Sequence, residues 1–364
     1  MAKRSQDELI AQASAAVTKR YKSSLSDRGD RALELPSVFL STGSLSLDRV
    51  CAGRNPGGIP IGPSQGRVIH IPGEWSTGKS LLLDNIFLSC QQAGGINLVS
   101  ETEGTRDPHF AEAIGLNLKR LEVQRPDTIE EMIDMGVEWH NSIRKSDATI
   151  PLCWGIDSLD STEAEKSAAK GMSEGGGWHY GGGRAEALGA GLRKIVKLTA
   201  RFPTSVIVLN QTRDNVGVMF GPKKRTPGGN PPHFYSSLEL MLTNSPLGVA
   251  RTESKMPPLS KQQQKRFGIY EDKGFVIGRW VRAKVTKTKI APTLQQEADF
   301  YIDFRKGVHQ WGGLLQSFLR EGKIELAPDG KGVRYKDQNF SSPGAWYAWL
   351  TKNPDALAET CYGE

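Results

Sequence analysis

Residues 73–80 of the chain are Gly73, Glu74, Trp75, Ser76, Thr77, Gly78, Lys79 and Ser80, and they match the pattern G-x-x-x-x-G-K-[ST]. The apolar run at residues 67–72 comes just before them and helix-forming residues follow, so we expect a strand to end and a helix to begin here. The glycines would let backbone N–H groups surround phosphates, and the helix N-terminus adds a favourable dipole. Lys79 would neutralise the β- and γ-phosphates, and the Ser80 hydroxyl would bind Mg²⁺. The stretch therefore predicts a site for a nucleoside triphosphate and magnesium.

The remainder of the chain fits an α/β protein built around this turn. Residues 80–92 predict the helix, and short apolar runs at residues 96–100, 152–156 and 204–209 predict further strands. This alternation from about residue 38 is typical of a mostly parallel central sheet with helices on both faces. We expect an N-terminal helix and linker at 1–37 that pack against another subunit, a core at 38–306, and a small C-terminal α+β domain at 307–364.

Composition places the chain among cytoplasmic proteins without a membrane span. Its 364 residues are 38% hydrophobic and 24% charged, and no apolar run approaches the roughly 20 residues that cross a bilayer. The polar start shows no signal core. Cys51, Cys90, Cys153 and Cys361 are too widely spaced for a metal site or a disulfide framework, so we expect reduced thiols.

Positive charge is concentrated in one part of the chain. Residues 212–290 hold 15 Lys or Arg against 5 Asp or Glu, a net charge of +10, whereas the whole chain carries +7 and the other residues therefore sum to −3. Such a stretch indicates a polyanion partner, although an ordinary solvated basic face remains the alternative.

Three segments interrupt the strand and helix pattern. Residues 171–183 contain seven glycines, residues 216–232 are rich in Gly and Pro, and residues 246–275 look like an exposed basic insertion. Long loops inside a compact domain are usually functional or disordered.

Carboxylates follow two of the predicted strands. Asp157 ends the run PLCWGID and is the candidate to hold the magnesium water shell, with a helix N-cap as the alternative. Glu101 and Glu103 both follow the strand at 96–100, and either could orient water at the γ-phosphate. Position along the strand does not choose between them.

Taken together, these motifs resemble the bacterial RecA family of DNA recombinases over nearly the whole chain. The phosphate loop resembles the family's, with Trp75 an unusual bulky member, and residues 41–48 resemble the start of its core. The resemblance implies ATP as the nucleotide and Glu103 as the water-orienting base. It also implies that Asp107 and Phe110 lie beside the adenine, with Phe110 stacking on it.

Residues 206–213 and 216–221 are the most specific match to the family. The resemblance makes Gln211 the sensor of the γ-phosphate, and it makes residues 212–230 a DNA-binding loop in which Val216 is a wedge between base steps. A capped strand end is the alternative for Gln211 and Arg213. A first DNA loop is expected at about 163–183. The expected DNA contacts are Arg184, Arg193, Arg213, Val216, Lys223, Lys224, Arg225, Gly228, Gly229 and Asn230.

Residues 285–292 resemble the stretch whose two lysines reach into the ATP site of the adjacent subunit. Lys287 and Lys289 would there stabilise charge on the transferring phosphoryl group. The alternative is an edge strand that lysines protect from aggregation.

Some features depart from the family pattern. The first DNA loop is richer in glycine and contains Trp178 and Tyr180, which could stack on bases or pin the loop to the protein. The insertion at 246–275 has no counterpart that we can place. A divergent phage or plasmid member of the family would fit these differences.

The resemblance implies an ATP-dependent recombinase that forms helical filaments on single-stranded DNA and exchanges strands with a homologous duplex. A hexameric helicase or other motor with the same ATPase core is one alternative. A non-catalytic accessory paralogue is another, although the presence of Lys79, Glu103 and Asp157 argues against it.

Overall fold

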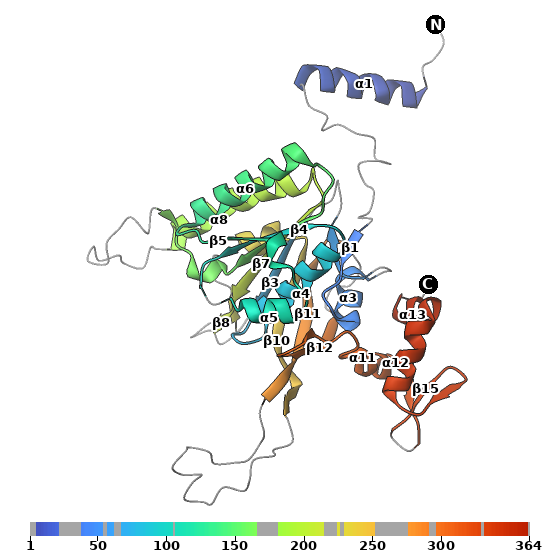
Figure 1. Cartoon of the computed structure of the whole chain (residues 1–364). Helices are drawn as coiled ribbons and strands as arrows, with labels where there is room; N and C mark the ends of the chain where they lie inside the picture. Colours follow the sequence, from blue (N-terminus) through green and yellow to red (C-terminus); the bar gives the residue numbers. More distant parts are fainter. Residues whose placement is uncertain are drawn as a thin grey trace, which may run out of the picture.

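The structure, a computed structural model, describes residues 5–21, 38–53, 57–61, 67–104, 106–165, 181–214, 224–225, 229–251, 276–290, 296–328 and 331–362. Figure 1 shows a central sheet with helices on both faces, helix α1 (Gln6–Tyr21) apart from it, and the C-terminal elements beside one end. No helix among these residues is both long and apolar enough to span a membrane.

Within the described residues, the central sheet has nine strands in the order β13-β12-β11-β10-β3-β7-β6-β4-β5. Their bounds are β3 (Arg67–Gly73), β4 (Ile96–Glu101), β5 (Leu121–Gln124), β6 (Leu152–Asp157), β7 (Thr204–Gln211), β10 (Leu238–Arg251), β11 (Val276–Thr288), β12 (Glu297–Asp303) and β13 (Gly307–Val308). The strands from β10 to β5 run parallel, and β11, β12 and β13 are added antiparallel. The predicted mostly parallel α/β sheet is confirmed.

Two hydrophobic clusters cover the two faces of this sheet. Helices α3 (Leu45–Ala52), α4 (Lys79–Gln92) and α5 (Pro108–Ala113) pack on one face, and α6 (Ile129–Ser146) and α8 (Gly181–Thr199) pack on the other. Alternate residues of β7 divide between them, because successive side chains of a strand point to opposite faces. Ile207 therefore packs with α4, and Val208 packs with α6 and α8. Burial on both faces explains why these strands read as continuous apolar runs.

A glycine permits the close approach of α6 to the sheet. A Cβ atom at Gly136 would lie 2.0 Å from Cζ2 of Trp154, a fully buried side chain on β6. Trp154 donates its indole N–H to Ser100 Oγ at 2.9 Å, which satisfies its polar atom inside the core.

The remaining elements are short, or belong to the C-terminal region. They are β1 (Val38–Leu40), β2 (Ile59–Ile61), β8 (Arg213–Asp214), β9 (Lys224–Arg225), α9 (Pro231–Tyr235), α11 (Leu314–Arg320), β14 (Glu325–Leu326), β15 (Val333–Tyr335), β16 (Gln338–Phe340), α12 (Pro343–Lys352), α13 (Pro354–Tyr362) and two 3-10 helices, Leu118–Arg120 and Leu159–Ser161. The C-terminal elements enclose a third cluster around Phe318 and Trp346.

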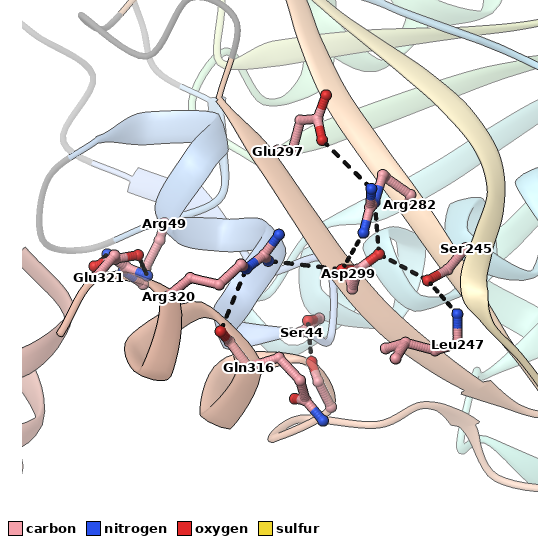
Figure 2. Close-up of polar contacts among 11 residues, drawn as sticks. Ser44, Arg49, Ser245, Leu247, Arg282, Glu297, Asp299, Gln316, Arg320 and Glu321 are labelled. Carbon is pink, nitrogen blue, oxygen red and sulfur yellow. Dashed lines mark hydrogen bonds and ion pairs between the residues drawn. The ribbon is translucent and has the colours of Figure 1, made fainter. Parts of the chain in front are cut away.

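Arginine–carboxylate pairs hold this C-terminal region against the core (Figure 2). Asp299 on β12, 3% exposed, accepts two hydrogen bonds from Arg282 at 2.9 Å and one from Ser245 at 2.8 Å, and it lies 3.6 Å from Arg320 of α11. Burial would raise the pKa of Asp299, but these partners lower it. Arg49 of α3 makes a bidentate pair with Glu321 at 2.9 and 2.8 Å.

Several boundaries differ from the sequence-based expectations. Residues 307–308 form β13 of the central sheet, and the third cluster begins at Leu314, so the change of packing comes after residue 306. Residues 246–251 belong to β10 rather than to an irregular insertion, and residues 252–275 lie outside the described part. Gly181–Gly183 form the first turn of α8, which shortens the expected first DNA loop. At residues 249–251, pairing with the neighbouring strand β11 outweighs the weak local strand pattern.

The N-terminal helix has an exposed apolar side. Leu9, Ile10 and Val17 of α1 are 51%, 50% and 45% exposed, and Figure 1 shows this helix away from the sheet. Its packing against another subunit stays a prediction, as do the three domain limits.

The buried carboxylate of Glu239 on β10 contacts side chains of β3, α9 and β11. Glu239 on β10 contacts Nδ1 of His70 at 2.8 Å and of His233 at 2.9 Å, and it accepts a hydrogen bond from Thr286 at 2.6 Å. Burial alone would raise the pKa of Glu239, but the hydrogen bonds and the charge of His70 lower it to about 2.

Acid should therefore destabilise the protein through Glu239. A depressed folded-state pKa stabilises the fold above the ordinary value of 4.5, and this stabilisation is lost as the pH falls toward about 2. We expect the carboxyl to contribute about 3 kcal/mol of the loss in unfolding free energy over this range. Denaturant unfolding at several pH values should show a shallower acid slope for Glu239→Gln than for the wild type; equal slopes would contradict the expectation.

Candidate nucleotide site and DNA-facing loops

The loop at 73–80 leaves β3 and enters α4 through a tight turn. Gly78 caps α4 with a φ of 76°, and Ser76 has a φ of 55°. A Cβ atom at Gly73 would lie 2.9 Å from Leu242 Cβ, and one at Gly78 would lie 2.5 Å from Ile302 Cδ1. Gly73 is therefore required by the close approach of β10, and Gly78 by its left-handed backbone.

Lys79 lies inside this turn. Its Nζ donates to the carbonyl oxygens of Gly73 at 3.2 Å and Glu74 at 2.8 Å, and the residue is 8% exposed. Burial lowers the pKa of Lys79, although the carboxylates of Asp157, Glu103 and Glu74 oppose this. The ammonium group thus lies where a phosphate would be bound, surrounded by acceptors.

A pocket of about 240 Å³ opens beside the loop, and its residues lie at or just after the ends of four strands. Its lining consists of Ser76, Gly78, Lys79, Ser80, Leu81, Glu103, Asp157, Ser158 and Gln211. Parallel strands β3, β4, β6 and β7 all end on this side, so their carboxyl ends bring distant segments together. Seven predicted site residues therefore share one pocket: Ser76, Gly78, Lys79, Ser80, Glu103, Asp157 and Gln211.

Asp157 is the last residue of β6, and it accepts a hydrogen bond from the Ser80 side chain. Burial raises the pKa of Asp157, while Ser80, Arg106 and Lys79 oppose the rise. Ser158, not Asp157, stands before the following 3-10 helix, so the N-cap alternative is wrong. A hydroxyl and a carboxylate side by side are oxygen ligands that suit magnesium.

Of the two candidate glutamates, Glu103 lines the pocket and accepts a hydrogen bond from Ser158 Oγ at 2.7 Å. Glu101 is buried at 4% exposure, accepts from the Arg106 backbone at 3.2 Å and lies 3.7 Å from Arg125. Glu103 therefore faces the pocket and Glu101 is held inside the protein, while the role of Glu103 as a base stays a prediction.

The expected adenine contacts lie at the start of α5. Asp107 caps this helix by accepting from the His109 N–H at 2.9 Å, and Phe110 is 9% exposed. Phe110 packs mostly inside the protein, so little of its ring is available for stacking in this conformation. Trp75, by contrast, is 76% exposed on the outside of the phosphate loop.

Lys287 and Lys289 lie away from the phosphate loop of their own chain. In the sheet, Lys287 of β11 lies opposite Glu239 of β10, which lies opposite His70 of β3. His70 comes three residues before Gly73, which places it about 10 Å from the start of the phosphate loop. Lys287 Nζ donates to the carbonyl oxygens of His233 and of Phe234, the latter at 2.9 Å, and burial lowers the pKa of Lys287. Although β11 lies between β10 and β12, β12 pairs only with Gly278–Lys284, so the edge-strand alternative stays open at Lys287 and Lys289.

The expected DNA contacts fall on two neighbouring segments. Arg184 on α8 donates to the Leu159 carbonyl, and Arg193 donates to the Tyr235 hydroxyl at 3.2 Å. Arg213 opposite Arg225 forms the two-residue hairpin β8–β9, and Gly229 and Asn230 are exposed before α9. For Lys224 and Arg225 the structure describes the backbone alone. The other expected contacts lie outside the described residues: Val216, Lys223, Gly228, Trp178 and Tyr180.

The structure also reveals site residues that sequence reasoning missed. Arg106, buried near Asp157, pairs with Asp84, and burial lowers the pKa of Arg106 to about 10. Arg279 of β11 contacts the phosphate loop itself. These residues belong to no short motif, so no local signal could have identified them.

A parallel sheet that carries this loop, with Asp157 at the end of a nearby strand, defines a P-loop nucleoside triphosphatase. A family model described as the RecA N-terminal domain matches residues 8–256. The chain therefore belongs to the RecA family of DNA recombinases, which are DNA-dependent ATPases.

Similar proteins extend over most of the chain. Protein RecA of Rubrobacter xylanophilus is 29% identical over 328 residues, covering 90% of this chain and 79% of that protein. Protein RecA 1 of Myxococcus xanthus is 28% identical over 349 residues, covering 96% and 90%. Protein RecA of Rhizobium etli is 30% identical over 339 residues, covering 93% and 82%.

Proposed function

We propose that this chain is an ATP-dependent recombinase that forms helical filaments on single-stranded DNA and exchanges strands with a homologous duplex. One observation carries the proposal: Lys79, Ser80, Glu103, Asp157 and Gln211 line a single pocket. A cycle of ATP binding and hydrolysis coupled to DNA requires these parts: a phosphate-binding lysine, magnesium ligands, a base, and a side chain next to the DNA loop.

ATP and Mg²⁺ fit the groups of this pocket. Lys79 and the turn at 73–80 would hold the β- and γ-phosphates, while Ser80 and Asp157 would hold the metal. The metal would neutralise charge on the phosphate oxygens. Glu103, oriented by Ser158, would position water and accept its proton.

Gln211 would connect the nucleotide with DNA. It ends β7 at the pocket, and Arg213 begins the β8–β9 hairpin two residues later. A contact between Gln211 and the γ-phosphate would therefore be transmitted directly to loop 212–230, which would contact the DNA backbone. Binding of this kind should weaken steeply with salt.

Lys287 and Lys289 would complete the ATP site of an adjacent subunit. Their position away from their own phosphate loop supports a role in trans. Hydrolysis would then depend on filament assembly. Four buried, unpaired cysteines among the described residues agree with the proposed cytoplasmic location.

Lys79→Ala should abolish ATP-dependent filament formation, because it removes the main positive charge that would neutralise the phosphates. Electron microscopy with single-stranded DNA and a non-hydrolysable ATP analogue would test this, together with a strand-exchange assay. Wild-type helical filaments that disappear in the variant are expected. Closed rings of the wild type would indicate a helicase-like motor. DNA binding without filaments would indicate an accessory role. Normal strand exchange by the variant would overturn the proposal.

A further inference from the structure

Two side chains from the β10–β11 hairpin hold the outside of the phosphate loop. Nη1 of Arg279 donates to the Ser76 carbonyl oxygen and, at 3.2 Å, to Asn244 Oδ1. Asn244 in turn donates from Nδ2 to Glu74 Oε2 at 2.9 Å. Arg279 and Asn244 thus contact the loop at two points, one on its backbone and one on a side chain.

The backbone contact lies at the most constrained point of the loop. Ser76 has a φ of 55°, in the left-handed region, although it has a side chain. A non-glycine residue in this region costs on the order of 1 kcal/mol, and the surroundings must supply that free energy. The Arg279 hydrogen bond to the Ser76 carbonyl favours this conformation, in which the following residues lead into α4.

Other contacts hold the base of the loop but not its tip. The Glu74 N–H donates to the Leu242 carbonyl at 3.3 Å, and Gly73 and Gly78 pack closely on Leu242 and Ile302. Nearer the tip, Arg279 donates to the backbone of Ser76 from a different strand, β11. Arg279 is therefore well placed to control the shape of the loop tip.

We propose that Arg279 is a positioning residue for nucleotide binding, which acts through the Ser76 carbonyl and is itself oriented by Asn244. It does not line the pocket, so it is not a catalytic residue. The inference rests on the proposed ATP site, and it adds a group from β11, 203 residues away from Ser76 in the sequence. With Arg279 in place, the loop is organised before the phosphates arrive, so less ordering remains to be done on binding.

Nucleotide affinity and steady-state hydrolysis in four variants would test this role. Arg279→Ala should weaken binding of a fluorescent ATP analogue about tenfold, as expected for the loss of a charged hydrogen bond. The KM for ATP should rise similarly, while kcat changes less than about twofold, because the groups at the reacting phosphate stay in place. Arg279→Lys should restore most of the affinity, since a single nitrogen makes both hydrogen bonds.

Asn244→Ala should weaken binding less, and its effect should not add to that of Arg279→Ala because the two residues share one network. Arg305→Ala, an exposed arginine in the turn after β12, is the control for loss of charge and should bind like the wild type. Binding equal to wild type in Arg279→Ala would overturn the proposal. The proposal would also fail if Arg279→Ala lowered the melting temperature, raised KM and lowered kcat by similar factors, and if Arg279→Lys restored none of these.

The nucleotide-binding measurements need no DNA, so they separate the two proposals. Loss of affinity in Arg279→Ala alongside a wild type without strand exchange would leave the loop inference standing and remove the recombinase function.

Discussion

A Lys287→Ala variant should bind ATP and DNA but hydrolyse ATP at least about 1,000-fold more slowly, as expected when a cationic finger is removed from phosphoryl transfer. Lys287 lies at the end of β11, away from its own phosphate loop, so we expect it to act on the neighbouring subunit's ATP. In the isolated chain its ammonium group binds carbonyl oxygens at the end of α9. Single-turnover hydrolysis with single-stranded DNA measures the effect.

The matched control is Lys284→Ala. Lys284 lies three residues earlier on the same strand and 3.5 Å from Glu297, so it should hydrolyse ATP at nearly the wild-type rate. Equal losses in both variants would indicate a general effect of positive charge on β11. A Lys287→Ala variant as active as the wild type would exclude the role in trans.

A Glu103→Gln variant should retain ATP binding and filament formation but lose about 100- to 10,000-fold in kcat, the usual contribution of a positioned base. The amide keeps the shape of the side chain and its contact with Ser158, whose hydroxyl donates to Glu103 at 2.7 Å. It cannot accept a proton from water. We also propose that hydrolysis releases the DNA, so filaments of this variant should persist longer on it.

Glu101→Gln separates this role from a structural one. Glu101 is buried at 4% exposure and bonded to the Arg106 backbone, so its loss should lower stability more than kcat. An active Glu103→Gln variant beside an inactive Glu101→Gln variant would reverse the assignment.

An equal mixture of Lys287→Ala and Glu103→Gln subunits tests whether they share the site. If each ATP contacts Glu103 of one subunit and Lys287 of the next, random assembly restores both groups at roughly a quarter of the interfaces. About that fraction of wild-type hydrolysis should return on mixing. Two residues that act within one subunit would give no recovery.

Much of the core was predictable because its signals are local. The strand at 67–72, the turn and the helix at 80–92 follow from hydrophobic pattern and glycine spacing, and the observed β3 and α4 each differ from them by one residue. The strands at β4, β6 and β7 were also predicted, since each is a buried run that ends in polar residues. The antiparallel strands β11 to β13 were not, because their alternating polar residues look irregular until partners are known.

The sequence by itself determined that a phosphate loop joins a buried strand to a helix, since neighbouring residues suffice for that turn. It left Glu101 and Glu103 equivalent, and only the family resemblance favoured one. Tertiary structure decided that Glu103 enters the pocket while Glu101 is buried beside Arg106. It also brought Arg279 against Ser76 across 203 residues. Such choices depend on which strands lie side by side, and sheet order is set by packing of the whole chain rather than by any local stretch.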